Sequence, residues 1–363
     1  MNGNDTRVIL FDGSITARRA IAVGINSETC TENFLKFFTL RLILKEIETY
    51  CKSYIPKNPG MGVLPIVAFD YGGSAYRREK LKSFKADRIK DYGGIEIVVP
   101  QGGYTGLKVD DPLVPADELF PLLQLFEEKS LEREYLTSQI TKKLFTSLRQ
   151  FFTTQMNEIG ILGYMKYGYE ADDIGYLFSH CTETRGLLVS DDKDWQLNLS
   201  DRYEISRPMK GEYVSLDSFN YSLKEVVEST GVDAPEIYRH ILALTGTHNN
   251  VEGYKGIGWA RGVQIAKLIL EGNGTLDLLD PKIKVHATVL ENPDLYHFNY
   301  NIVGSDHIKE DRQLLLDDIK SKLELVSEKP TQMDYLKLLS SIGAKTLVQY
   351  SYLLNYFKKN INI

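Results

Sequence analysis

The sequence predicts an α/β protein whose sheet is mostly parallel and flanked by helices. Three short apolar runs predict strands, and each is followed by aspartate. The runs are Arg7–Phe11, Leu64–Phe69 and Gly186–Val189, and the aspartates are Asp12, Asp70 and the pair Asp191-Asp192. Segments with apolar residues at helical spacing lie between the runs. Alternation of helices with fully apolar strands is typical of a parallel sheet covered on both faces.

The helical segments follow from the same periodicity. Glu32 to about Tyr54 has apolar residues at helical spacing, and a second helix is expected from about Arg261 to Leu270, after a glycine-rich turn at Gly253–Gly258. From Asp217 onward the pattern is mostly helical. We therefore expect an α/β core in residues 1–210 and a helical domain in residues 211–363, with the boundary near 208–216.

Composition is typical of a soluble globular protein. The chain has 363 residues, of which 43% are hydrophobic and 25% charged, and a net charge of -6. No apolar run is long enough to span a bilayer, and the polar N-terminus lacks a signal peptide's apolar core, so we expect no membrane association. Three scattered cysteines indicate free thiols in a reducing cytosol. The negative net charge argues weakly against a general nucleic-acid binder, but basic residues can still cluster locally.

One long connection differs from the rest of the chain. Residues 92–129 contain two Gly-Gly pairs and four prolines, and acids dominate between Asp110 and Glu134. We interpret this segment as an insertion, and a solvated surface loop is the commonest state of such a segment.

Seven acids follow predicted strands or open a predicted helix. In Tyr169–Ile174 (YEADDI), Glu170 and Asp173 are three apart and can face the same way. Asp192 and Asp194 alternate on what we expect to be extended backbone, so their side chains can point to one side. Because sites in parallel sheets lie at the carboxyl ends of the strands, we expect the acids to converge. The set is Asp12, Asp70, Glu170, Asp172, Asp173, Asp192 and Asp194.

Converging carboxylates need a counter-charge. Two of them about 4 Å apart repel by roughly 4 kcal/mol at an effective dielectric constant of about 20. Divalent cations relieve this repulsion, and oxygen ligands without His or Cys select Mg²⁺ or Mn²⁺. Such ions lower the pKa of bound water and stabilise the attacking and leaving oxygens of a phosphodiester. A single Asp more often caps a helix or lies in solvent, but that explanation does not account for the whole set.

A basic segment follows the second predicted strand. Tyr76 to Lys90 is expected to be a helix with seven Lys or Arg residues against two acids. Lys85 and Arg88 lie one turn apart on one face, where they would grip a scissile phosphate and offset charge in the transition state. An exposed, solvated helix is the alternative.

Together these motifs resemble the flap endonuclease/5′ exonuclease superfamily, and within it the T-even phage ribonuclease H type. The resemblance rests on YEADD at 169–173, SDDKDW at 190–195, Asp12-Gly13 after a strand, and FDxxxxxxRRxxxxxFKxxR at 69–88. The Gly253–Gly258 turn is similar to that of the family's helix–three-turn–helix DNA clamp. Segments 311–317 and 335–352 are similar to the end of phage members, so the resemblance covers residues 7–352.

The resemblance implies a PIN-like 5′ nuclease core, a helical arch at about 76–160, and a C-terminal helix–three-turn–helix domain. It implies metal-dependent cleavage near a 5′ end, at flaps, nicks or RNA primers, in DNA replication or repair. We expect a monomer in the cytoplasm, of the host cell if the protein is phage-encoded.

The resemblance also implies roles for individual residues. The first-metal cluster would be Asp12, Asp70, Glu170 and the catalytic Asp172, and the second-metal side Asp173, Asp192 and Asp194. Lys85 and Arg88 would contact the phosphate that is cut. Residues toward nucleic acid would be Arg18, Arg19, Arg77, Gly253, Gly256, Gly258 and Arg261. The turn would also hold a monovalent cation such as K⁺.

The chain departs from the family at the second metal site. The family usually has GDxxDN before the clamp turn, whereas this chain has Gly246-Thr-His-Asn-Asn250, with neutral Thr247 and Asn249 where acids are expected. A second ion held weakly, a one-metal reaction, or a weakened homologue that mainly binds branched DNA are the alternatives. The acidic insertion would repel non-specific DNA or dock a replication protein.

Overall fold

The computed structural model describes residues 6–25, 31–58, 60–82, 92, 97, 109–247, 251–359 and 361. The chain divides into two compact units: residues 1–69, 90–165 and 319–361 form the first, and residues 70–89, 166–318 and 362–363 form the second. Residue 210, the predicted domain boundary, lies inside the second unit. The compact units and the predicted domains therefore divide the chain differently.

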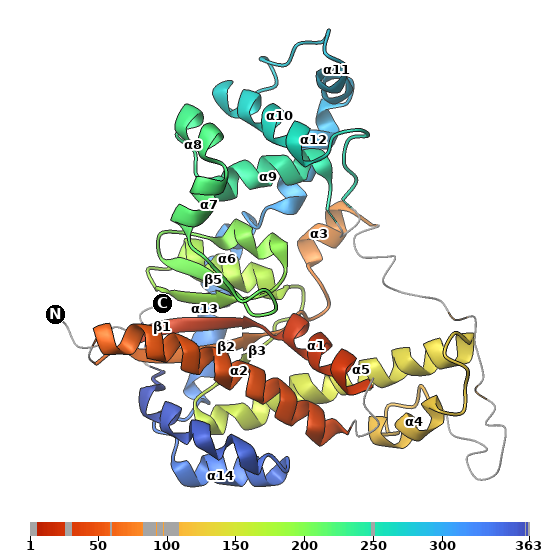
Figure 1. Cartoon of the computed structure of the whole chain (residues 1–363), viewed down its shortest axis with the longest axis vertical. Helices are drawn as coiled ribbons and strands as arrows, with labels where there is room; N and C mark the ends of the chain where they lie inside the picture. The colour runs from red at the N-terminus through yellow and green to blue at the C-terminus, as the bar shows by residue number, and fades with distance from the viewer. Residues whose placement is uncertain are drawn as a thin grey trace. The chain divides into compact units, whose positions relative to one another are not determined.

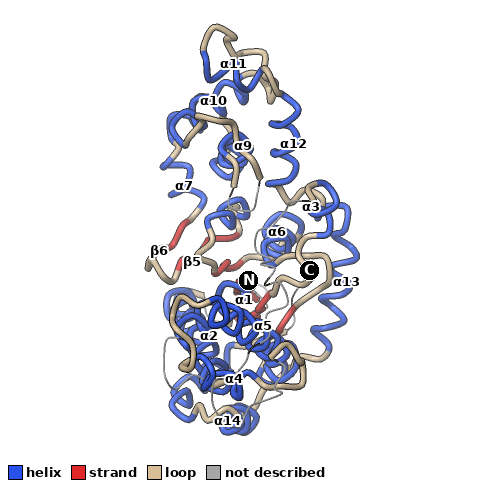
Figure 2. The backbone as a smooth tube through the Cα atoms, turned by 90° about the vertical axis from the view of Figure 1, so that its right-hand side faces the viewer, coloured by secondary structure: helices blue, strands red, loops and turns tan. Residues whose placement is uncertain are grey.

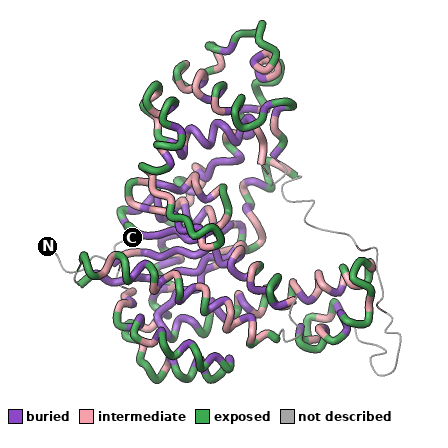
Figure 3. Tube along the Cα trace, viewed as in Figure 1, coloured by how far each residue is buried: buried purple, intermediate pink, exposed green. Residues whose placement is uncertain are grey.

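The first unit contains three parallel strands in the order β3–β2–β1. They are β1 (Thr6–Asp12), β2 (Gly62–Ala68) and β3 (Leu162–Tyr164). Every residue of β2 is buried, as expected for a central strand covered on both faces (Figure 3). The predicted β1 and β2 are confirmed, whereas β3, with three residues, is too short for its periodicity to be detected.

Helices make up most of the rest of this unit. The α-helices are α1 (Gly13–Ile25), α2 (Glu32–Tyr54), α4 (Ala116–Leu123), α5 (Leu131–Thr154) and α14 (Gln332–Ser341). The 3₁₀ helices are η1 (Ile55–Lys57), η3 (Gln155–Ile159) and η5 (Lys345–Tyr356). Helix α2 has the predicted bounds because Thr31 caps it, accepting a hydrogen bond from the Phe34 amide at 3.1 Å, and Pro56 follows its end.

Part of the predicted insertion is a helix rather than a solvated loop. Helix α4 buries Leu119 and Leu122 and packs against α5. Arg133 closes the turn between the two helices by donating to the carbonyls of Leu123 at 2.7 Å and Phe126 at 3.1 Å. The loop prediction was therefore wrong for 116–123, where prolines obscure the helical spacing. Residues 93–96 and 98–108 lie outside the described residues.

The second unit contains β4 (Gly186–Val189) and β5 (Tyr203–Arg207), which are parallel, and β6 (Glu212–Val214), which is antiparallel to β5. Of the strand pairs within the units, as far as they are described, only β5–β6 is antiparallel. The prediction of a mostly parallel sheet flanked by helices is confirmed.

The helices of the second unit include all of those around the predicted DNA clamp. They are α3 (Ala75–Lys80), α6 (Ala171–Cys181), η4 (Lys193–Asn198), α7 (Leu216–Ser222), α8 (Lys224–Thr230), α9 (Ala234–Thr245), α10 (Trp259–Glu271), α11 (Lys284–Leu290) and α12 (Pro293–Val303). Helix α13 (Ile308–Glu324) begins in this unit.

Helix α9 packs against both α10 and α12 (Figure 1). Figure 2 shows that strands are short and that helix predominates. Among the described residues, no helix combines the length and the apolarity needed to cross a membrane.

Candidate functional site

The start of helix α6 organises the acids of the second unit. Glu170 is its N-cap, and the Glu170 amide donates to Asp173 Oδ2 at 3.0 Å. The Asp173 amide donates to Asp172 Oδ1 at 3.1 Å. Acids are favoured here because they accept from unpaired amides and face the positive end of the helix dipole. The same carboxylates therefore begin the helix and form the cluster.

Asp70 joins this cluster from the end of the second predicted strand. Its Oδ1 accepts from the Ala171 amide at 3.0 Å. The Tyr71 amide donates to the Tyr169 carbonyl at 3.2 Å, which fixes the chain after Asp70 against the approach to α6. The structure thus brings together four of the seven predicted acids, namely Asp70, Glu170, Asp172 and Asp173.

A buried arginine lies among these acids. Arg77 Nη1 is 2.7 Å from Glu170 Oε2 and 3.0 Å from Asp172 Oδ2, and Nη2 is 3.3 Å from Asp173 Oδ1. Ser74 caps α3 by accepting from the Arg77 amide at 3.3 Å, and only 5% of the Arg77 side chain is exposed. We predicted that Arg77 faces nucleic acid; in this structure α3 directs its guanidinium inward, where it balances carboxylates, and the nucleic-acid role stays a prediction.

The ionisation of the cluster follows from burial and from this guanidinium. Burial raises the pKa of Asp173, the Arg77 charge opposes that shift, and the Asp172 and Glu170 charges add to it. Burial and then the Arg77 charge lower the pKa of His307 to about 4. His307 is therefore neutral at pH 7, so its approach to Asp173 Oδ1 at 3.5 Å is not an ion pair.

Two residues of the cluster carry no motif in the sequence. Ser305 accepts from Arg77 Nη2 at 3.1 Å and donates to Asp173 Oδ1 at 3.3 Å. His307 stacks on Tyr76 with ring centroids 4.4 Å apart and planes 5° from parallel. Both belong to the connection between α12 and α13, far from the acids in sequence, and no local spacing marks them.

Asp192 and Asp194 are placed by a 3₁₀ helix rather than by extended backbone. Asp192 is the N-cap of η4, and its Oδ1 accepts from the Asp194 amide at 3.1 Å. The predicted alternation was wrong because an Asp that caps the next residues favours a turn over a strand. Asn198, at the end of η4, donates to the Asp172 carbonyl at 3.1 Å and so ties η4 to α6.

A cavity of about 990 Å³ lies beside η4. Asp192 and Asp194 line it together with Thr247, Gly253 and Trp259. Two of the three predicted second-metal acids, Asp192 and Asp194, therefore border the same space as the clamp turn, whereas Asp173 lies in the α6 cluster. Thr247, which stands where the family has an acid, lines that space too. Asn249 and His248 lie outside the described residues.

The clamp turn is held by close backbone approaches. An added Cβ on Gly253 would lie 2.2 Å from the Thr245 carbonyl oxygen, so glycine is required there. The Tyr254 amide donates to the Leu244 carbonyl at 2.9 Å. Arg261 Nη1 donates to the Gly256 carbonyl at 2.6 Å and so closes the turn against the start of α10.

Asp12 belongs to the first unit, where it ends β1 and caps α1. Its Oδ1 accepts from the Ile15 amide at 2.9 Å, and its carbonyl accepts from the Thr16 hydroxyl at 2.8 Å. The side chain is buried. On the same helix Arg18 is exposed and Arg19 half-buried.

Lys85 and Arg88 lie outside the described residues. The predicted helix at 76–90 is present as α3 up to Lys80, and Leu81 has extended backbone. The roles given to Lys85 and Arg88 therefore stay predictions.

The donor set of the α6 cluster suits a hard divalent cation. Its ligands are carboxylate oxygens, and the Arg77 guanidinium stands in for positive charge among them. Among the described residues, no three Asp, Glu, His or Cys side chains are grouped so as to hold an ion as they stand.

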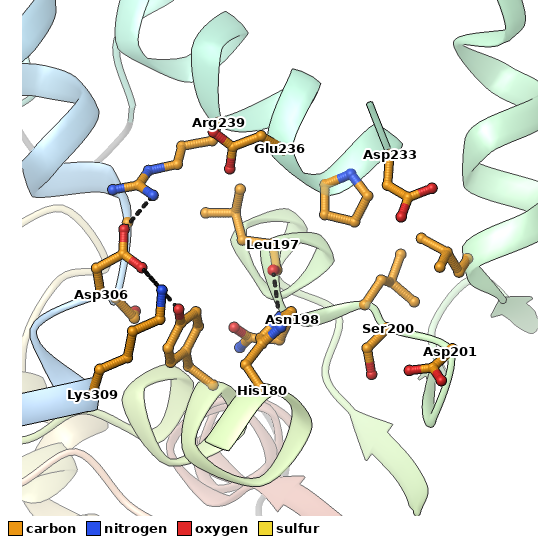
Figure 4. Close-up of a pocket in the computed structure, with 16 residues that line it drawn as sticks. His180, Leu197, Asn198, Ser200, Asp201, Asp233, Glu236, Arg239, Asp306 and Lys309 are labelled. Atoms are coloured by element: carbon orange, nitrogen blue, oxygen red, sulfur yellow. Dashed lines mark hydrogen bonds and ion pairs between the residues drawn. The ribbon is translucent and has the colours of Figure 1, made fainter. Parts of the chain in front are cut away.

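A second cavity, of about 440 Å³, lies elsewhere in the second unit (Figure 4). Asp306 accepts from Lys309 at 2.7 Å, from Tyr176 at 2.9 Å and from Arg239 at 2.5 Å. On another wall His180 donates to the Leu197 carbonyl at 3.4 Å. Arg239, Asp306 and Lys309 pair with one another on its wall, and none of the predicted site residues lines the cavity.

No protein-family model matches the chain. Three solved structures of a bacteriophage T5 protein are similar to it. A flap endonuclease variant, crystallised as a pseudo-enzyme–product complex with DNA and metal ions, is 21% identical with a TM-score of 0.55, over 88% of this chain and 98% of that one. The same protein with metal ions is 20% identical with a TM-score of 0.54, over 89% and 100% of the two chains.

The third structure is the T5 5′-exonuclease with zinc, at 20% identity and a TM-score of 0.53 over 89% of this chain and 100% of that one. At this level of identity the likeness shows the fold. The chain has the fold of the T5 5′ nuclease over most of its length, which confirms the fold that the motifs implied.

Proposed function

We propose that the chain is a metal-dependent 5′ nuclease, a 5′–3′ exonuclease and flap endonuclease with ribonuclease H-type primer removal, acting in DNA replication or repair. The observation that carries this proposal is the cluster of Asp70, Glu170, Asp172 and Asp173 at the start of α6. Capping explains part of this cluster, but Arg77 brings one positive charge to three carboxylates, and a divalent cation would balance the remaining negative charge.

The proposed roles follow exposure and position. A bound Mg²⁺ or Mn²⁺ supplies a Lewis acid and lowers the pKa of water next to the phosphodiester. Three acids of the α6 cluster contact Arg77, and Asp172 is the most exposed of them. Its side chain is 25% exposed, compared with 3% for Glu170 and 0% for Asp173. Asp172 would face the ion and substrate, while the other two orient and balance it.

The remaining residues keep the roles predicted from the sequence. Asp12, Asp192 and Asp194 would complete the metal ligands, and Lys85 and Arg88 would contact the scissile phosphate. Residues proposed to contact nucleic acid or to shape its binding turn are Arg18, Arg19, Gly253, Gly256, Gly258 and Arg261. We propose that residues 1–210, with an arch at about 76–160, cut the strand and that residues 211–363 hold the duplex, with K⁺ at the turn.

The T5 structure with DNA and metal ions supports DNA as the ligand and a divalent cation as the cofactor. The proposed substrates are DNA with a 5′ flap, a nick or an RNA primer. We further propose a monomer that acts in the cytoplasm, of the host cell if phage-encoded. A replication protein would dock on the acidic segment around α4.

The proposal is tested by cleavage of a 5′-labelled flap and of an RNA·DNA primer duplex, with Mg²⁺, Mn²⁺ or EDTA. We expect metal-dependent cutting by wild type, none by Asp172→Asn, and wild-type rates for Asp201→Asn, a control in which an exposed acid of the same unit is neutralised. Cutting in EDTA, or by Asp172→Asn at the wild-type rate, would refute the metal role.

The alternative is a weakened homologue that mainly binds branched DNA. The specific observation in its favour is Thr247, a neutral residue on the cavity wall where the family has an acid. This alternative predicts flap binding by wild type and Asp172→Asn without cleavage by either. Thr247→Asp would then be expected to raise metal-dependent cutting.

A further inference from the structure

We propose that Trp259 stacks on an unpaired nucleobase of the bound strand, at the cavity beside η4. The proposal rests on the proposed function in one respect, that the ligand is DNA with an unpaired end or flap. It adds a base-binding surface that the sequence motifs did not mark.

The two tryptophans of the chain have opposite environments. Trp195 is 2% exposed, whereas Trp259 is 52% exposed. Trp259 is the first residue of α10 and directly follows the clamp turn. A single exposed apolar residue is ordinary on a protein surface, so exposure alone does not identify a site.

Aromatic rings support the Trp259 indole from the protein side. The Tyr238 ring lies 5.9 Å from it at 54°, and Phe219 lies 5.8 Å from Tyr238 at 79°. Both of these supporting residues are buried. The three rings form a series that runs from the core to the surface, and it holds the indole in place while part of it stays accessible. A fixed, half-exposed ring loses little side-chain entropy when a base stacks on it.

The cavity that Trp259 borders is lined by two chemically different kinds of group. Phe219, Tyr238 and Trp259 contribute aromatic surface, while Asp192 and Asp194 contribute carboxylates. Its volume of about 990 Å³ is at the upper end of the roughly 300–1,000 Å³ typical of small-ligand pockets. A nucleotide also combines two such parts. Its planar base would contact the aromatic rings, and its charged phosphate would be linked to the carboxylates by a divalent cation.

A buried arginine also lines the cavity. Arg207 lines the cavity, its side chain is 6% exposed, and Nη2 donates to the Asp191 carbonyl at 3.3 Å. Its Nε–H has no hydrogen-bond partner within the described part of the chain. The Nε atom is itself buried, and Nη1 lies 3.5 Å from Glu212 Oε2, so Arg207 contributes positive charge at the cavity rather than an accessible donor.

An unpaired base fits this surface better than a base pair. Bases inside a duplex already stack on their neighbours, whereas a flap or a frayed end presents a free π face. Stacking does not depend on base identity, which suits a site that meets any sequence. The site would hold the unpaired strand next to the turn proposed to hold the duplex.

Fluorescence and affinity together test this proposal. Flap DNA is titrated into proteins that also contain Asp172→Asn, so that the strand stays intact, in Mg²⁺. We expect quenching of tryptophan emission with Trp259 present and none in Trp259→Leu, whose remaining tryptophan is buried. Trp259→Leu keeps an apolar contact with Tyr238 but should weaken binding by roughly 5- to 150-fold.

Two controls separate stacking from folding. Trp259→Phe keeps a ring and should bind more tightly than Trp259→Leu. Tyr221→Leu removes a 76% exposed aromatic of the same unit that does not line the cavity, and should bind as wild type does. Thermal unfolding followed by circular dichroism checks that each variant is folded.

Oligonucleotides with single abasic positions identify the base. At one unpaired position, we expect removal of the base to weaken DNA binding by the Asp172→Asn protein that keeps Trp259. The same removal should not weaken DNA binding by the protein that also contains Trp259→Leu. Equal affinities of the Trp259 protein and Trp259→Leu for every oligonucleotide would overturn the stacking and leave the nuclease proposal intact. No binding of any DNA by the wild type would overturn both.

Discussion

Arg77 donates to Glu170 over 2.7 Å between side chains that are 5% and 3% exposed. The same guanidinium contacts Asp172 and Asp173, so one cation balances three carboxylates in the α6 cluster. A buried ion pair stabilises a fold little more than two apolar residues in its place would. Removal of one partner alone is strongly destabilising, because it leaves a buried charge without compensation. The first prediction follows from that asymmetry.

Arg77→Met should lower the free energy of unfolding by about 3–5 kcal/mol in EDTA, because the three acids lose their counter-charge. Urea unfolding measures the loss. Arg78→Met is the matched control: Arg78 is exposed and donates to the Gly73 carbonyl at 3.4 Å, so the loss of stability should stay within about 0.5 kcal/mol. Equal losses in the two variants would contradict the role given to Arg77.

Mg²⁺ or Mn²⁺ should raise the thermal unfolding temperature of the wild type. A cation that binds only the folded state at 100 times its Kd adds about 2.7 kcal/mol. The increase should be lost in Asp172→Asn and kept in Asp201→Asn. An increase that survives Asp172→Asn would place the ion elsewhere.

Asp306→Asn should destabilise the protein in a pH-dependent way. Burial raises the Asp306 pKa, but the hydrogen bond from Lys309, the charge and hydrogen bond of Arg239 and the hydrogen bond from Tyr176 lower it well below its usual value. The stabilisation from this carboxylate is therefore present above its unfolded pKa of about 3.9 and is lost as pH falls towards the folded value.

Urea unfolding at several pH values checks this expectation. Wild type should be more stable than Asp306→Asn at pH 7, and the gap should narrow steadily as the pH falls below about 4. Asp201→Asn, at an exposed position, should show no such trend. If the difference in unfolding free energy stayed constant with pH, the packing of the Asp306 side chain rather than its charge would explain the loss of stability.

Gly253→Ala should open the clamp turn, because its Cβ would lie 2.2 Å from the Thr245 carbonyl oxygen. We expect a loss of about 1–3 kcal/mol in stability, typical of overpacking, together with weaker duplex binding. Asp201→Asn is the control, because Asp201 is exposed and does not line the cavity beside the clamp turn, so its duplex binding should match the wild type. If Gly253→Ala bound duplex DNA as tightly as the wild type does, the clamp turn would not contribute to DNA binding.

The periodic elements could be predicted from the sequence because local pattern determines them. Strands β1, β2 and β4 each contain a buried apolar run, and α2 has a cap at one end and a proline after the other. The acids at the start of α6 could also be found, since Tyr169–Ile174 combines a capping pattern with negative charge. Short β3 and the proline-flanked α4 had no comparable signal.

The interior of the cluster could not be predicted because it depends on long-range contacts. Arg77 reads as one cation of a basic helix, and nothing near it in sequence shows that α3 points it at Glu170. Ser305 reaches Arg77 from 228 residues away. The 3₁₀ turn at Asp192 was missed because the Asp cap outweighs the strand-like alternation around it.

The capping role of the acids at α6 has an evolutionary consequence. The Glu170 amide is bound by the Asp173 carboxylate, so replacing Asp173 would fray the helix as well as weaken a metal site. A lineage that stopped cutting DNA would still be selected to keep this residue for folding. The presence of Asp173 in a related protein would therefore not distinguish a nuclease from a protein that only binds DNA, whereas the residue at the position of Thr247 would.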